Sequence, residues 1–221
     1  MYLITLYILY LVSIVAGVYG LVNRAHIRKS FFWLSIFLLC SGVFQYTSHV
    51  LAKIYQNNLL WNNIILLIYY LIVYLIFVYF TKNPRTLRIN NILFLIGGII
   101  ILVLDGVAIN KGVMAFEAIT VSNLVFSIAS MLYFLDMLRT PSLQSPFRTG
   151  KVYALTGFLF YHTAIIFYWV AKILIESMEP GTGGSQSTLA AYVNHIMLII
   201  YYIILFVALV VEKRDPIKDE Y

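Results

Sequence analysis

The chain is poor in charge and in cysteine, and its long apolar runs contain no proline. Of its 221 residues, 11% are charged and 62% are hydrophobic, so the chain cannot build a water-facing surface around a soluble core. Its single cysteine, Cys40, excludes an intramolecular disulfide. The prolines all lie between the apolar runs or after the last one, where helices end. They are Pro84, Pro141, Pro146, Pro180 and Pro216. These absences exclude a soluble domain and favour uninterrupted membrane helices.

Seven apolar segments are each long enough to cross a bilayer as a helix, which needs about 20 residues. They run roughly over residues 1–22, 31–54, 59–81, 89–109, 113–138, 152–177 and 189–211. The chain has none of the segments of about ten alternating residues that are typical of a transmembrane β-strand. The sequence therefore predicts an all-α protein, a single domain over residues 1–221 with seven transmembrane helices. The Gly-rich run Gly181–Ser185 follows Pro180 and is predicted to be a flexible turn.

The basic residues predict the orientation of these helices. Twelve of the fifteen Lys and Arg residues fall in every second gap or in the tail. They are Arg24, Arg28, Lys29, Lys82, Arg85, Arg88, Arg139, Arg148, Lys151, Lys213, Arg214 and Lys218. Because positive loops stay in the cytoplasm, the N-terminus is predicted to face outside and the C-terminus inside. Contact with anionic lipid headgroups accounts for the net charge of +6 without a nucleic-acid partner.

Short internal matches suggest a repeat. Segment Asn62–Tyr70 resembles Asn194–Tyr202, and Leu51–Ile54 resembles Val170–Ile173. The matches pair the first span with the fifth, the second with the sixth and the third with the seventh. This order predicts a parallel three-helix repeat joined by the fourth span. The alternative is chance similarity in a chain rich in Ile, Leu and Tyr.

Polar side chains are costly inside a bilayer, so the place where they gather indicates a site. In the second span, Gln45 and His49 lie on one helical face, and most polar residues of the other spans also fall in the predicted outer half. We therefore expect a polar cavity in the outer half of the bundle. Its candidate residues are Gln45, His49, Asn63, Tyr70, Glu117, Asn123, His162, His195 and Tyr202. The alternative for each is a hydrogen bond between helices that only holds the bundle together.

Three classes of function remain open at this point. The favoured one is a sensor or receptor-like subunit that binds a small or lipidic ligand and signals to a separate cytoplasmic partner, such as a histidine kinase. The second is an intramembrane enzyme in which His49, His162 and His195 hold a metal or haem together with Glu117. The third is a small-solute transporter built on the parallel repeat. The sequence identifies no cofactor, and a homo-oligomer is compatible with it.

Known seven-helix families do not fit at their most specific residues. The metal hydrolases of the adiponectin-receptor and ceramidase type carry a His-x-x-x-His pair, but Ile199 stands four residues after His195. Microbial rhodopsins need a lysine in the seventh span, and residues 189–211 contain none. Sugar and vitamin carriers with a three-helix repeat have paired prolines inside their helices, which this chain lacks.

Three short motifs carry a looser resemblance. They are Asn57–Asn63 at the start of the third span, Ser127–Leu138 with its Tyr-Phe-Leu-Asp sequence, and the pair Asn194-His195 at the start of the seventh span. With the chain length, they resemble a group of small seven-helix inner-membrane proteins of Bacteroidetes-type bacteria. The resemblance implies a seven-helix fold, a location in the bacterial inner (cytoplasmic) membrane and a link to two-component signalling. It implies no chemistry for any residue.

Overall fold

The computed structural model describes residues 2–56, 58–81, 83–139, 149–178 and 183–214. Over these residues the chain forms seven α-helices, one short 3₁₀ helix and no strand, which confirms the all-α prediction. The α-helices are α1 (Tyr2–Val22), α2 (Lys29–Tyr55), α3 (Leu59–Val78), α4 (Pro84–Lys111), α5 (Phe116–Arg139), α6 (Gly150–Met178) and α7 (Gly183–Arg214). Each is long and apolar enough to span a membrane, so this is a seven-helix membrane protein. The 3₁₀ helix η1 (Arg24–His26) lies between α1 and α2.

Helix α4 begins at Pro84, five residues before the start that hydropathy alone predicts. The Asn83 side chain accepts a hydrogen bond of 3.0 Å from the Arg85 N–H and so caps the helix. Pro84 follows at the first helical position, where its missing N–H costs nothing. The same helix ends at Gly112, whose φ of 64° turns the chain toward α5. Capping groups rather than apolar character therefore set both ends of α4.

Helix α7 also begins earlier than predicted. Its first residue is Gly183, so the last part of the Gly-rich run is helical instead of a turn. Gly181 and Thr182, the remaining residues of that prediction before the helix, lie outside the described residues.

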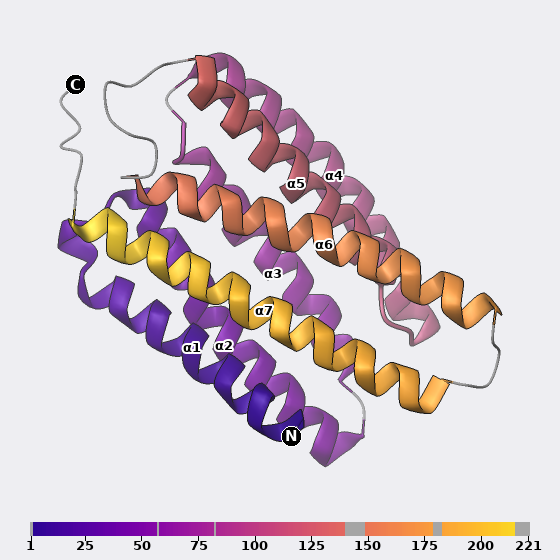
Figure 1. Cartoon of the computed structure of the whole chain (residues 1–221). Coiled ribbons are helices and arrows are strands. Elements are labelled where there is room, and N and C mark those ends of the chain that lie inside the picture. Colours follow the sequence, from indigo (N-terminus) through magenta and orange to yellow (C-terminus); the bar gives the residue numbers. More distant parts are fainter. Residues whose placement is uncertain (1, 57, 82, 140–148, 179–182, 215–221) are drawn as a thin grey trace.

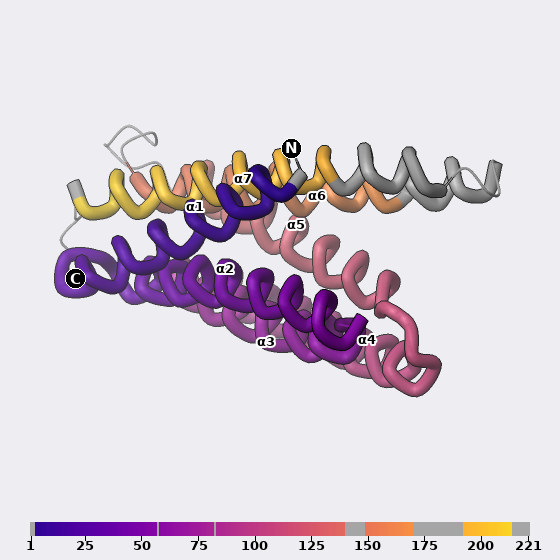
Figure 2. The backbone as a smooth tube through the Cα atoms, turned by 90° about the horizontal axis from the view of Figure 1, so that it is seen from below, coloured from indigo at the N-terminus to yellow at the C-terminus, as the bar shows by residue number. Residues whose placement is uncertain are grey.

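The seven helices run alongside one another (Figure 1), and their contacts close a ring in chain order. Each helix packs against the next, α7 returns to pack against α1, and across the interior α2 touches α7 and α3 touches α5. Figure 2 shows α1 beside α2, and near the C-terminal end of α1 the Tyr19 ring lies 5.3 Å from the Phe206 ring of α7. In the same view the α2–α3 side and the α6–α7 side diverge toward the end of the bundle that holds the N-terminus.

Close approach of α1 and α2 depends on small residues. A Cβ atom at Gly17 would lie 2.5 Å from the backbone nitrogen of Leu39, and one at Gly20 would overlap the Ser35 hydroxyl. Membrane helices gain little from apolar burial against each other, so this close van der Waals contact is what holds such a pair together. Large rings fill the rest of the interior, among them Phe77, Phe158 and Tyr201.

Charged groups gather at the end of the bundle opposite the N-terminus, near the connecting segments that are rich in Lys and Arg. Arg28 forms a two-pronged ion pair with Glu212, in which Nη2 lies 2.6 Å from Oε2. Glu212 is only 1% exposed. Asp136 at the end of α5 accepts hydrogen bonds from Thr81 at 2.9 Å and Asn83 at 2.6 Å. These contacts join α2, α7, α5 and the segment before α4 at one end, which the charge pattern predicts to be cytoplasmic.

Candidate functional site

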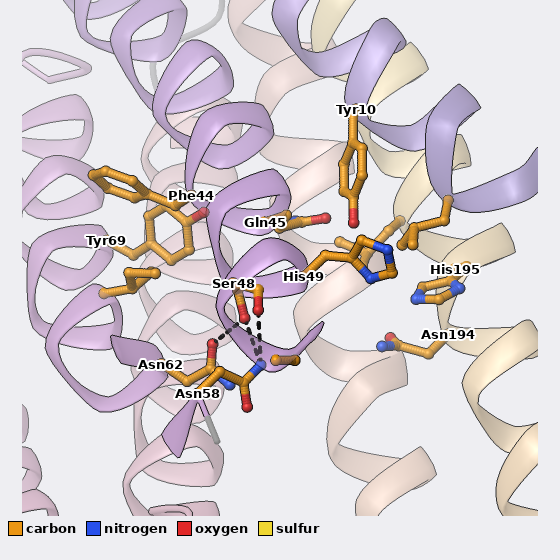
Figure 3. Close-up of a pocket in the computed structure, with 14 residues that line it drawn as sticks. Tyr10, Phe44, Gln45, Ser48, His49, Asn58, Asn62, Tyr69, Asn194 and His195 are labelled. Atoms are coloured by element: carbon orange, nitrogen blue, oxygen red, sulfur yellow. Dashed lines mark hydrogen bonds between the residues drawn. The ribbon is translucent and has the colours of Figure 1, made fainter. Parts of the chain in front are cut away.

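A cavity of about 390 Å³ lies between α1, α2, α3 and α7, at the end of the bundle away from the Arg28–Glu212 pair (Figure 3). Its position is the outer half in the predicted orientation. Fourteen described residues line it. They are Leu6, Tyr10, Phe44, Gln45, Ser48, His49, Ala52, Asn58, Asn62, Ile65, Tyr69, Asn194, His195 and Leu198.

Helix α2 supplies the longest wall of the cavity. Gln45, Ser48, His49 and Ala52 occupy positions i, i+3, i+4 and i+7, so they lie on one helical face. The sequence predicts that Gln45 and His49 share a helical face, because polar and small residues repeat there with helical spacing, and both line the cavity. Two of the nine candidate residues thus reach the cavity from α2, and His195 reaches it from α7.

Ser48 anchors the side of the cavity formed by α2 and α3. Its hydroxyl donates to the Asn62 side-chain oxygen at 2.7 Å and accepts from the Asn58 amide at 2.8 Å. The Asn58 amide also lies 3.2 Å from the Ser48 carbonyl. Nearby, the Trp61 indole donates to the Thr47 hydroxyl at 3.1 Å. These bonds fix the α2–α3 hairpin, so this wall is preorganised.

The other side of the cavity comes from α7. Facing it across the cavity is His49 of α2. Figure 3 shows His49 of α2 and the pair Asn194 and His195 of α7 pointing into the same space, below the Tyr10 ring. Nε2 of His49 and Oδ1 of Asn194 are buried and have no hydrogen-bond partner among the described residues. Buried polar atoms are normally satisfied, so these two need a partner that the described residues do not supply, such as a ligand or water.

The described lining contains no Asp, Glu, Lys or Arg. A charged ligand would lose its hydration on entering and find no opposite charge in these walls, which is costly. The cavity therefore suits a neutral molecule that both donates and accepts hydrogen bonds. Leu6, Ile65 and Leu198 supply apolar surface beside the polar groups.

Tyr202 lies next to the cavity through Gln45. The Gln45 amide donates to the Tyr202 hydroxyl at 2.7 Å, and Tyr202 is 2% exposed. This bond crosses from α2 to α7. These two predicted site residues are therefore bonded to each other, but only Gln45 lines the cavity, and Tyr202 belongs to the core.

Three candidates have other partners. Asn63 donates to the Val113 carbonyl at 3.3 Å and accepts from the Ala115 N–H at 3.4 Å, so it holds the α4–α5 turn. Tyr70 donates to the Phe94 carbonyl at 2.7 Å and joins α3 to α4. Glu117 is exposed in the first turn of α5, a favourable place for an acidic group because of the helix dipole. None of the three lines the cavity.

Asn123 and His162 form a separate pair between α5 and α6, with Nδ1 of His162 2.6 Å from Oδ1 of Asn123. His162 is absent from the cavity lining, so the structure does not bring together the three histidines of the metal or haem alternative. In the described part of the chain, no three His, Cys, Asp or Glu side chains lie close enough to hold a metal ion.

Sequence reasoning missed the contribution of α1 and of the α2–α3 turn. Leu6 and Tyr10 belong to a helix without a polar stripe, so no pattern marks them. Asn58 precedes α3 and could have been found as a polar residue next to the predicted second and third spans. Asn62 lines the cavity where Asn63 was expected, because neighbouring residues on a helix point about 100° apart.

A second hollow of about 460 Å³ lies between α3 and α4. Leu71, Leu95 and Ile99 line it and are more than half exposed on the outer surface of the bundle. In a membrane this apolar groove faces lipid tails, so the polar cavity is the candidate site. No family model, curated protein or solved structure matches this chain.

Proposed function

We propose that this protein is a receptor-like membrane subunit that binds a small neutral molecule in the cavity between α1, α2, α3 and α7. The observation that carries the proposal is the pair of unpartnered buried atoms, His49 Nε2 and Asn194 Oδ1, in an uncharged pocket. Polar groups are kept at such depth in a membrane mainly where they have a function.

The size of the cavity supports a ligand of modest dimensions. Its volume of about 390 Å³ is at the lower end of the range typical of small-molecule sites. Its polar groups and its apolar wall of Leu6, Ile65 and Leu198 suit an amphipathic molecule, whether it comes from solution or from the lipid phase.

Binding rather than catalysis is favoured by the chemistry of the lining. The described lining offers His49 and His195 but no carboxylate and no thiol beside them. An acid–base or nucleophilic mechanism usually needs such a second group. The signal would pass to the basic end of the bundle, where a cytoplasmic partner such as a histidine kinase could receive it.

A cavity-filling substitution tests the proposal. Ala52 lines the cavity, so Ala52→Phe adds bulk there without removing a hydrogen-bonding group. Val43 lies on the same helix and is 42% exposed, so Val43→Phe adds the same kind of bulk on the outer surface. Unfolding temperatures of the purified proteins are measured with fractions of a bacterial metabolite and lipid extract.

We expect a fraction to raise the unfolding temperature of the wild type and of Val43→Phe but not of Ala52→Phe, because a ligand stabilises the fold it binds. If Ala52→Phe responds as strongly as the wild type, the cavity is not the binding site.

A further inference from the structure

Two buried polar atoms away from the cavity also lack a partner among the described residues: the Tyr201 hydroxyl of α7 and Nε2 of His162 in α6. Tyr201 is 1% exposed and His162 is 6% exposed. Their rings are neighbours, with centroids 5.7 Å apart and an edge-on arrangement. Two unsatisfied groups on neighbouring rings in the core of a membrane bundle are costly unless each finds a partner, and one molecule between the rings can bond both.

The hydrogen bond to Asn123 decides what His162 can offer. The Asn123 amide nitrogen donates to the Ile119 carbonyl at 2.7 Å, so its oxygen is the atom that faces His162. That oxygen can only accept, and therefore Nδ1 of His162 carries the hydrogen. Nε2 is then left with a lone pair and needs a donor. The Tyr201 hydroxyl can both donate and accept.

A group of tyrosines connects this place to the cavity. The Tyr161 and Tyr201 rings stack at 4.6 Å, and the Tyr201 and Tyr202 rings lie 5.4 Å apart. The Tyr69 and Tyr201 rings both neighbour the Phe37 ring, with centroids 5.6 Å and 6.4 Å from it. Tyr69 lines the cavity, and Tyr202 accepts the hydrogen bond from Gln45 of the cavity wall.

We propose that the space between Tyr201 and His162 is a binding site for a structural water molecule. The water donates a hydrogen bond to Nε2 of His162 and accepts one from the Tyr201 hydroxyl. Buried waters typically bond to groups that are otherwise unsatisfied. The site connects the tyrosine rings next to the Gln45–Tyr202 bond with the His162–Asn123 pair.

Through this connection a change at the ligand site could reach other helices. This role of the water site rests on the proposed function. Gln45 belongs to α2 and Tyr202 to α7, whereas His162 and Asn123 join α6 to α5. A ligand that draws the Gln45 amide away from Tyr202 would shift Tyr202 and, through ring contact, Tyr201. The disturbance would then reach the α5–α6 pair, which the cavity itself does not touch.

Nitrogen-15 labelling of histidine tests the water site, because the chain has only four histidines. Spectra of the wild type in lipid nanodiscs are assigned by replacing each histidine in turn with Gln. Transfer of magnetisation from water to each imidazole is then measured. We expect His162 to hold its hydrogen on Nδ1 and to receive magnetisation from water, as His49 in the cavity does.

Two tyrosine variants separate the site from general hydration. Tyr201→Phe removes the hydroxyl that the water needs, so the transfer to His162 should fall to background while the transfer to His49 remains. Tyr70→Phe removes a buried hydroxyl that bonds the Phe94 carbonyl on another pair of helices, and it should leave the transfer at His162 unchanged.

The failures of the two proposals look different in this experiment. If His49 receives magnetisation and His162 does not, or if His162 carries its hydrogen on Nε2, the water site is wrong and the cavity stands. A signal at His162 that survives Tyr201→Phe also overturns the site. If none of His49, His195 and His162 receives magnetisation from water, the water site is wrong. The cavity is then not hydrated, which also argues against the proposed function.

Discussion

Gln45 of α2 donates its side-chain amide to the Tyr202 hydroxyl of α7 at 2.7 Å. Gln45 lines the polar cavity, and Tyr202 is buried in the core beside it. The bond therefore connects the candidate ligand site with the interior of the bundle, across two helices that meet only at a few places. Its strength and its coupling to neighbouring groups decide how the cavity is held in shape.

Removing either end of this bond should lower stability by a similar small amount. Hydrogen bonds between membrane helices contribute on average about 0.6 kcal/mol, with a maximum near 1.7 kcal/mol. We expect Gln45→Leu and Tyr202→Phe each to lower the free energy of unfolding by roughly 1 kcal/mol. Denaturant unfolding in mixed micelles measures both variants and the double variant.

The double variant should cost clearly less than the two single variants added together, because both remove the same bond. Strictly additive losses would mean that Gln45 and Tyr202 do not interact. Tyr74→Phe is a suitable control, since the Tyr74 hydroxyl donates to Asn91 at 3.3 Å on an exposed face and should contribute little.

Removing Arg28 should lower the free energy of unfolding more than removing the charge of Glu212. Glu212 is 2% exposed at its side chain and Arg28 is 28% exposed. Arg28→Met leaves a buried carboxylate without its partner, which costs about 3 kcal/mol or more. Glu212→Gln leaves a guanidinium that can turn toward water and headgroups, so its cost should be smaller. Equal losses of unfolding free energy, or a greater loss for Glu212→Gln, would contradict the conclusion that Glu212 is the more buried partner.

Two glycines offer a matched test of helix packing. A Cβ atom at Gly17 would press on the Leu39 backbone, whereas one at Gly106 has nothing within 4 Å. Gly17→Ala should therefore destabilise the protein by about 1–3 kcal/mol through overpacking. Gly106→Ala should be neutral or stabilise by up to about 1 kcal/mol, because alanine favours a helix. Similar effects at both positions would argue against the close α1–α2 contact.

The number and places of the helices could be predicted because a bilayer requires about 20 apolar residues for each span. The residues at which the helices begin and end were less predictable. Apolar character fades gradually, while the capping of α4 by Asn83 and Pro84 and the turn at Gly112 depend on single groups. The parallel repeat and the orientation stay predictions.

The candidate site could be predicted only in part. A helical stripe places Gln45 and His49 on one face of α2, and the structure puts both in the cavity. The rotation of each helix about its axis depends on packing with its neighbours. Sequence alone therefore could not tell that Asn63 holds the α4–α5 turn, or that Tyr10 of an apolar helix covers the site.

Orientation can be tested with single cysteines in a Cys40→Ser background. Tyr55 ends α2 and is 70% exposed, and Ala25 is exposed in η1 at the opposite end of the bundle. Because basic loops stay in the cytoplasm, a membrane-impermeant maleimide should label Tyr55→Cys in intact cells. It should label Ala25→Cys only after lysis. The reverse pattern would place the cavity on the cytoplasmic side.

We propose that the cavity between α1, α2, α3 and α7 holds a small neutral molecule. Such a molecule can be detected by native mass spectrometry of protein released from lipid nanodiscs, with the wild type, Ala52→Phe and Val43→Phe purified side by side. We expect a one-to-one adduct of a small neutral molecule on the wild type and on Val43→Phe, and its loss from Ala52→Phe. An adduct that Ala52→Phe retains would show that the molecule does not bind in the cavity.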